Sequence, residues 1–222
     1  MDFVHYDVVR KMSRIFGVSI GSAVVAISAS ARIAVDDQIP NSAADAKPIK
    51  VGAMVPKAEL RSLEGKAVKL SEVLGGKPTV LVFYRGGWCP FCNMHLADLG
   101  KVEGEIRAKG YQIVAITPDL PEELNKTLDK HHMTYKLYSD SAADAMKKFG
   151  VAFRLDDKTF TMYKNSYHID LEKSSGHDHH ILPVPSVFLI NKSGKIVFAS
   201  SNPDYKIRLK GSDILEAIDK NK

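Results

Sequence analysis

The chain has 222 residues, of which 45% are hydrophobic and 26% charged, and its formal net charge is +5. This length fits one ordinary domain with an ample apolar core. The basic residues are scattered, without a run of five or six, so the charge favours solubility and gives no support to nucleic-acid binding.

The N-terminus reads as an export signal. Arg10, Lys11 and Arg14 precede an apolar stretch over residues 15–27, which is too short to span a bilayer comfortably. Ala29-Ser30-Ala31 then fits a signal-peptidase site, so we predict a signal peptide over residues 1–31 and a periplasmic or secreted protein. An uncleaved anchor, which would attach the protein to a membrane, and a buried helix are the alternatives.

Two different segments follow the predicted signal. Residues 32–48 are polar and unpatterned, rich in Ala, Asp, Ser and Pro, and are predicted to be a flexible tether. Residues 49–222 form the remaining domain. Its first part, residues 51–74, has short apolar alternations around a turn at residues 63–66, which predicts a small hairpin.

A strand–turn–helix–strand pattern occupies the middle of the chain. Residues 79–84 are a continuous apolar run of strand length, and residues 112–117 are a second one. Between them, residues 94–109 carry apolar side chains at helical spacing and are followed by a glycine. Pro90 suits the first helical turn, where its missing N–H costs nothing. The pattern predicts a βαβ unit.

The rest of the chain alternates in the same way. Its predicted elements are helix 121–132, strand 135–138, helix 142–149 capped by Ser141, a helix from residue 156 or 157 to 167, loop 173–180, strand 186–190, turn 191–194, strand 195–199, and a last helix from residue 212 or 213 to 220. Alternating strands and helices predict an open α/β sheet.

Cys89 and Cys92, the two cysteines of the chain, lie where the first helix of the βαβ unit begins. Free N–H groups and the helix dipole at that end favour a thiolate, and Arg85 would add to the effect if its side chain turns back over the site. A structural zinc site would normally draw on four ligands, and the sequence has no second C-x-x-C; the two cysteines also lie on a turn, at the spacing of a small disulfide ring, unlike inert core cysteines. We therefore predict a redox-active pair, shielded by Trp88.

These motifs carry a family resemblance. Strand, Trp-Cys-Pro-Phe-Cys, helix and strand, followed by a prolyl strand and hairpin, resemble the thioredoxin fold. Over residues 51–220 the fuller pattern resembles the peroxiredoxin-like members of the AhpC/TSA group; it includes Gly52 to Pro56, Phe83 to Gly86, 184–190 and 202–209. The resemblance implies a thioredoxin-like α/β fold, with a central mixed sheet flanked by helices and an N-terminal hairpin extension.

The resemblance also implies an antioxidant thiol peroxidase without a cofactor. Hydroperoxides would be reduced through a Cys89/Cys92 dithiol–disulfide cycle, and an external thiol, such as a thioredoxin-like protein, would regenerate the pair. The usual peroxiredoxin motif P-x-x-x-T-x-x-C places Cys92 at the peroxidatic position and Cys89 at the Thr position. The Arg that assists the reaction falls at Pro185, so both activating residues are missing and we expect slow turnover.

A thioredoxin-like protein disulfide oxidoreductase is the alternative. Pro185 resembles the cis-proline that thioredoxins set against their disulfide, and Trp88 and Pro90 also favour this function. In that scheme Cys89 attacks a disulfide substrate and Cys92 resolves, whereas the peroxiredoxin alignment reverses the roles. The sequence leaves open which cysteine attacks first.

A short histidine tract gives a second alternative. His177, Asp178, His179 and His180 form a cluster that is compositional evidence only, and a solvated loop explains it without a metal. SCO-type copper chaperones, which resemble peroxiredoxins, bind copper with two cysteines and a His from the loop before the same strand. His177, His179 and His180 are thus candidate copper ligands, since thiolate and imidazole suit that metal.

Overall fold

The computed structural model describes residues 39–131 and 134–221. The predicted signal peptide and residues 32–38 of the predicted tether lie outside these ranges. Within them, no helix combines the length and apolar character needed to cross a membrane.

The central feature is a seven-stranded mixed sheet with the strand order β2-β1-β5-β4-β3-β8-β9. Strand β3, next to the central strand β4, runs parallel to β4 and antiparallel to β8. The strands are β1 (Glu59–Arg61), β2 (Ala67–Lys69), β3 (Thr79–Phe83), β4 (Gln112–Thr117), β5 (Lys136–Ser139), β8 (Ser186–Ile190) and β9 (Ile196–Ser201). The predicted fold class is confirmed, and β1 and β2 form the predicted N-terminal hairpin.

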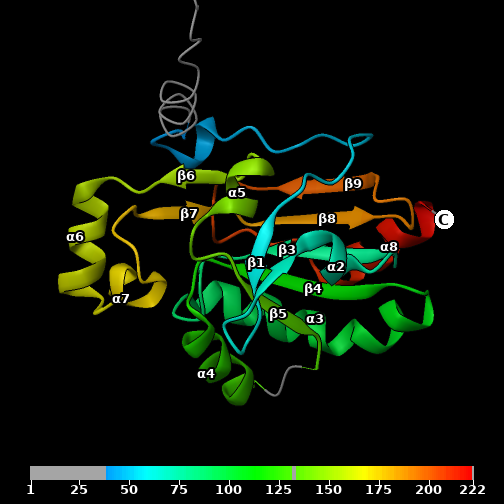
Figure 1. The fold of residues 1–222 in the computed structure, drawn as a ribbon, viewed down its shortest axis with the longest axis horizontal. Helices are drawn as coiled ribbons and strands as arrows, with labels where there is room; N and C mark the ends of the chain where they lie inside the picture. Colours follow the sequence, from blue (N-terminus) through cyan, green and yellow to red (C-terminus); the bar gives the residue numbers. More distant parts are fainter. Residues whose placement is uncertain (1–38, 132–133, 222) are drawn as a thin grey trace, which may run out of the picture. The chain divides into compact units, whose positions relative to one another are not determined.

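Side-chain alternation in β3 divides the core into two layers. Val80 and Val82 point to one face, where they pack with α3 (Pro90–Ala108), α4 (Pro121–His131) and α8 (Gly211–Lys220). Leu81 and Phe83 point to the other face, covered by α2 (Leu70–Leu74) and α5 (Asp144–Lys148). A strand buried on both faces is a continuous apolar run for this reason. Figure 1 shows α3 and α4 along the same side of the sheet.

A smaller layer extends one end of the domain. Strands β6 (Ala152–Arg154) and β7 (Ile181–Pro183) form a separate antiparallel pair, and α6 (Asp157–Ser166) and α7 (Leu171–Ser175) lie between them in the sequence. Lys164 of α6 contacts the Glu172 carboxylate of α7 at 2.9 Å. Figure 1 shows these two helices together beside β6 and β7.

The described part of the predicted tether is packed against the domain, so the prediction of flexibility is wrong for residues 39–48. This segment contains the short helix η1 (Ala43–Asp45). The Arg154 N–H donates to the Pro40 carbonyl at 2.8 Å, and the Ile49 N–H donates to the Phe149 carbonyl at 2.9 Å. Polar composition alone does not show such backbone pairing.

Two local predictions also need correction, and two short elements were not predicted. The predicted loop begins late, since α7 extends to Ser175. The elements α2 and β6, of five and three residues, are too short for their periodicity to be read from sequence. Helix α5 is held by the Asp140 carboxylate, which accepts from the Ala145 and Met146 N–H groups, and not by Ser141 as predicted.

Candidate active site

A glycine turn places the cysteines beyond the end of β3. Gly86 has φ +154°, and a Cβ at this position would overlap the Trp88 indole. The Gly87 N–H donates to the Asp119 carboxylate at 2.7 Å, and a Cβ there would overlap Thr127. Both positions therefore require glycine, and the turn is fixed to the segment after β4.

Cys89 is the N-cap residue of α3, and Pro90 is the first residue of the helix, as predicted. The Cys89 carbonyl accepts from the Cys92 and Asn93 N–H groups at 3.0 and 3.1 Å. Both cysteines are free thiols, and both are buried, with 2% of Cys89 and none of Cys92 exposed. Cys89 is therefore covered by the protein, although it lies at the end of the glycine turn.

The two thiols have opposite electrostatic environments. The Cys92 side chain donates a hydrogen bond to Cys89, and together with the Cys92 N–H, Arg85 and Arg208 it lowers the pKa of Cys89 to about 6. Burial, and then the neighbouring Cys89, raise the pKa of Cys92 well above its ordinary value. The first proton lost from the pair therefore leaves a thiolate on Cys89, stabilised by the Cys92 thiol.

Arg85 turns back over the site, as the sequence analysis required for it to act on the thiolate. It is 3% exposed, and its Nη2 donates to the Tyr163 hydroxyl of α6 at 2.7 Å. The guanidinium carbon lies 4.3 Å from the ring centre of Tyr205, 5.3 Å from that of Trp88 and 5.5 Å from that of Tyr163. These ring faces hold a buried cation next to the cysteines.

Arg208 is the residue that sequence reasoning missed. Its Nη2 lies 3.4 Å from the Cys92 sulfur, although 116 positions separate the two residues in the chain. Pro185 stands where the family's usual arginine would be, and Arg208, from the segment after β9, adds a second cation to that of Arg85. The segment 202–209 belongs to the family-like pattern, but no local periodicity indicates where its side chains point.

Asp119 is a second missed residue. The sequence shows no buried acid in the strand before the cysteines, yet this carboxylate, 1% exposed, reaches the turn from the end of β4. It accepts from the Gly87 N–H and, at 2.9 Å, from the Ser174 hydroxyl of α7. Burial raises the pKa of Asp119 to about 7, against the effect of these two hydrogen bonds.

Comparison with known proteins agrees with this geometry. The AhpC/TSA family model matches residues 51–199. The chain belongs to the AhpC/TSA family. It is 28% identical to peroxiredoxin Bcp of Escherichia coli over 104 residues, 47% of the chain and 66% of that relative. It is 24% identical to the thiol-disulfide oxidoreductase ResA of Halalkalibacterium halodurans over 158 residues, 71% of the chain and 72% of the relative.

Solved structures of peroxiredoxins share the fold of this chain. The peroxidoxin BcpB of Mycobacterium tuberculosis superposes with a TM-score of 0.59 and 20% identity, over 78% of this chain and 99% of that one. A peroxiredoxin 6 mutant of Arenicola marina superposes with a TM-score of 0.62 and 21% identity, over 77% and 72% of the two chains. The predicted resemblance to peroxiredoxin-like proteins with the thioredoxin fold is confirmed.

Pro185 departs from the expected thioredoxin likeness. No peptide bond in residues 39–131 and 134–221 is cis, so the predicted cis-proline is wrong. The chain runs extended from β7 into β8, with the Val184 N–H donating to the Val151 carbonyl at 2.8 Å and the Pro185 carbonyl accepting from Asn202 at 3.2 Å. Pro185 lines a pocket beside the site together with His95 and Arg208.

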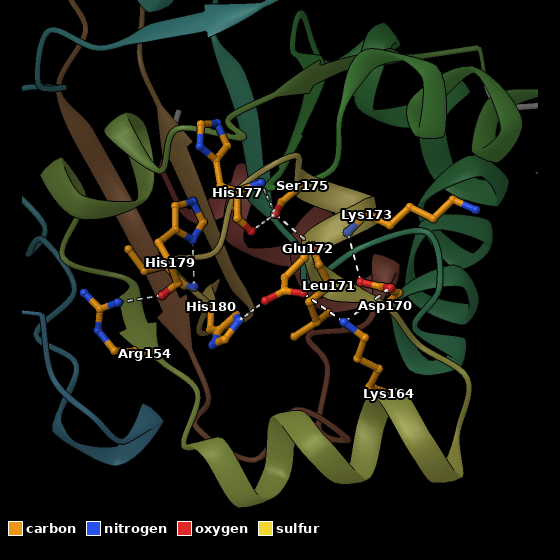
Figure 2. A network of polar contacts seen from close by, with 11 residues as sticks. Arg154, Lys164, Asp170, Leu171, Glu172, Lys173, Ser175, His177, His179 and His180 are labelled. Carbon is orange, nitrogen blue, oxygen red and sulfur yellow. Dashed lines mark hydrogen bonds and ion pairs between the residues drawn. The ribbon is translucent and has the colours of Figure 1, made fainter.

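Two side chains of the histidine loop, those of His179 and His180, contact other groups of the protein. The Ile181 N–H donates to His179 Nδ1 at 3.0 Å, so Nε2 carries the proton and donates to the Ser141 carbonyl at 2.8 Å. His180 contacts the Glu172 carboxylate at 3.1 Å and stacks on Phe160. Figure 2 shows His179 and His180 turned toward different neighbours. Within the described ranges no three metal-binding side chains gather at one point.

Proposed function

We propose that the protein reduces hydroperoxides through a dithiol–disulfide cycle of Cys89 and Cys92, regenerated by an external thiol such as a thioredoxin-like protein. The observation that carries the proposal is the Cys89 thiol, whose pKa is lowered to about 6 although only 2% of the residue is exposed. Such a site combines a thiolate at neutral pH with a sulfur that a folded partner cannot contact directly.

The cycle balances without a cofactor. The Cys89 thiolate attacks the hydroperoxide, an S–O bond forms, the O–O bond breaks, and the leaving alkoxide takes a proton to become an alcohol or water. The Cys92 sulfur then attacks the sulfenic sulfur, forming the disulfide and releasing water. Two external thiols reduce the disulfide and become a disulfide themselves. The Arg208 cation favours the charged form of either sulfur.

Protein disulfide exchange is the second candidate, favoured by the similarity to ResA over 71% of the chain. The burial of Cys89 argues against it, because a protein disulfide reaches this sulfur only after the turn moves.

Two measurements separate these candidates. We expect the wild type to consume hydroperoxide with dithiothreitol as reductant, and Cys92→Ser to accumulate a sulfenic acid on Cys89 that a dimedone-type probe labels. If wild-type peroxide consumption equals the protein-free rate and Cys92→Ser instead traps mixed disulfides with protein substrates, exchange is the function.

We further propose that the protein is exported, from the sequence of residues 1–31. Mass spectrometry of the protein from its native host should find Arg32 or a near neighbour at the N-terminus. An intact Met1 in a cytoplasmic fraction would overturn this proposal.

A further inference from the structure

Unpaired polar atoms concentrate at the cysteine pair. In the part of the chain that the structure describes, four buried side-chain nitrogen or oxygen atoms near the cysteines have no hydrogen-bond partner: Arg85 Nε, Asn93 Oδ1, His95 Nε2 and Arg208 Nε. All four belong to residues within three positions of a cysteine or to residues that interact with one. Because buried polar groups are normally paired, this clustering indicates a site that takes polar groups from outside the chain.

The site also carries uncompensated positive charge. Neither Arg85 nor Arg208 forms an ion pair with a described residue. The nearby carboxylates accept from backbone groups instead: Asp119 from Gly87, Asp98 from Gly211 and Asp213 from Lys210. One Cys89 thiolate balances only one of the two guanidinium groups, so an anion is favoured here.

A pocket of about 150 Å³ gives this anion a place. It lies between α3, β8, β9 and the segment after β9, and its lining includes His95, Ser186, Ser200, Ser201, Asn202 and Arg208. Asp213 also lines it, and that carboxylate accepts from the Lys210 N–H and the Ser212 hydroxyl. Nη2 of Arg208 contacts the Cys92 sulfur, whereas Nε of the same planar group is unpaired. Because these two nitrogens share one edge of the guanidinium, an oxygen that reaches the buried Nε would lie beside the cysteine pair.

We propose that this pocket binds the carboxylate of a small co-substrate whose other end reacts at the cysteine pair. The co-substrate is either a short acidic thiol that reduces the disulfide or a short acidic hydroperoxide. A volume of about 150 Å³ has room for a carboxylate with a few carbon atoms. The identity of the reacting group, a thiol or a hydroperoxide, rests on the proposed function. The binding of the carboxylate does not depend on it.

Alkylation of the reduced protein tests carboxylate binding without any peroxidase turnover. Iodoacetate and iodoacetamide are nearly the same size, but only iodoacetate carries a negative charge. The rate of Cys89 alkylation by iodoacetate divided by the rate with iodoacetamide therefore reports binding of a carboxylate. We expect the wild type to have a ratio several times that of a free small-molecule thiol, and Arg208→Gln to lower it on the order of tenfold, the value of one charge-assisted hydrogen bond.

Two further variants separate the pocket from general charge. Ser200→Leu fills the pocket but keeps Arg208 and both cysteines, and it should also lower the ratio. Lys206→Gln removes an exposed cation from the same segment and should leave the ratio unchanged. A wild-type ratio equal to that of a free thiol, an unchanged ratio in Ser200→Leu, or an equal fall in Lys206→Gln would each overturn the proposal.

Steady-state kinetics then identify the source of the carboxylate. 3-Mercaptopropionate is compared with 2-mercaptoethanol as reductant, corrected for thiolate concentration, and monoperoxysuccinate is compared with peracetate as oxidant. The acidic member of one pair should be favoured in the wild type and lose its advantage in Ser200→Leu. If no peroxide is consumed but the alkylation ratio behaves as expected, the proposed function fails and the carboxylate subsite stands; equal kinetics within both pairs would overturn the co-substrate assignment.

Discussion

The cysteine turn and the histidine loop are both candidate sites by composition, and the structure treats them in opposite ways. At the turn, the polar atoms of Arg85, His95 and Arg208 include buried nitrogens without partners. In the loop, His179 and His180 are each bonded to the protein. In a structural cluster the polar groups are hydrogen-bonded within the protein. A reactive site can instead be recognised by buried donors and acceptors that have no partner in the protein.

The largest expected effect tests this contrast directly. Cys89→Ser should lower thiol-dependent peroxide consumption by at least about a thousandfold, because it removes the nucleophile of the cycle. The triple variant His177→Ala, His179→Ala, His180→Ala should keep the wild-type rate in the same coupled assay. A rate retained by Cys89→Ser, or lost in the folded triple variant, would place the reactive site elsewhere than at the turn.

The sequence could predict what depends on local pattern. The buried strand β3, the helix that starts at Pro90, and the family were all predictable, because apolar periodicity, a proline and a C-x-x-C motif are local signals. Arg208 and Asp119 were not, since they reach the turn from distant segments and their neighbours in sequence give no orientation. The electrostatics of the site therefore emerge only from the tertiary fold.

A second prediction sharpens the role of the buried cation. Arg85→Met removes one of the positive charges that lower the pKa of Cys89, so that pKa should rise from about 6 by about one unit. The rate of Cys89 alkylation at pH 6 should then fall about fivefold, with little change above pH 8. Arg61→Met, at an exposed position of β1, is the matched control. An unshifted midpoint in Arg85→Met would show that the Cys92 hydrogen bonds and Arg208 stabilise the thiolate without Arg85.

The buried acid beside the turn should affect stability rather than reactivity. The pKa of Asp119 is about 7 in the folded protein and near 3.8 ordinarily, so its contribution to the free energy of unfolding is full below pH 4 and is lost as the pH rises through 7. Asp119→Asn keeps the shape of the side chain and should remove a pH dependence on the order of 2–4 kcal/mol over this window. Denaturant unfolding at several pH values measures it.

Asp140 should also contribute to the pH dependence of the free energy of unfolding. Burial also raises the pKa of Asp140 to about 7, so part of the slope should persist in Asp119→Asn and disappear only when Asp140→Asn is added. An identical slope in the wild type and in Asp119→Asn would mean that the Asp119 carboxylate is ionised throughout, held by the Gly87 and Ser174 hydrogen bonds.

The smallest expected effect concerns the histidine loop. His179→Ala leaves the Ile181 N–H and the Ser141 carbonyl without their partners, and should lower the free energy of unfolding by about 1–2 kcal/mol. His177→Ala is a matched control within the same loop, because that side chain is exposed and its ring only stacks on His179. It should change stability by less than about 0.5 kcal/mol.

The same variants decide between a structural loop and a copper site. If His179 serves packing alone, His179→Ala lowers stability while the Cu(I) affinity of the reduced protein, measured by competition with a chromogenic chelator, stays at the wild-type value. A copper site shared with the cysteines gives the reverse order, since His177→Ala would then weaken Cu(I) binding without destabilising the fold. Because the bonded nitrogens of His179 face Ser141 and Ile181, binding copper through them would first require breaking these hydrogen bonds, and we expect the affinity of the triple alanine variant to equal that of the wild type.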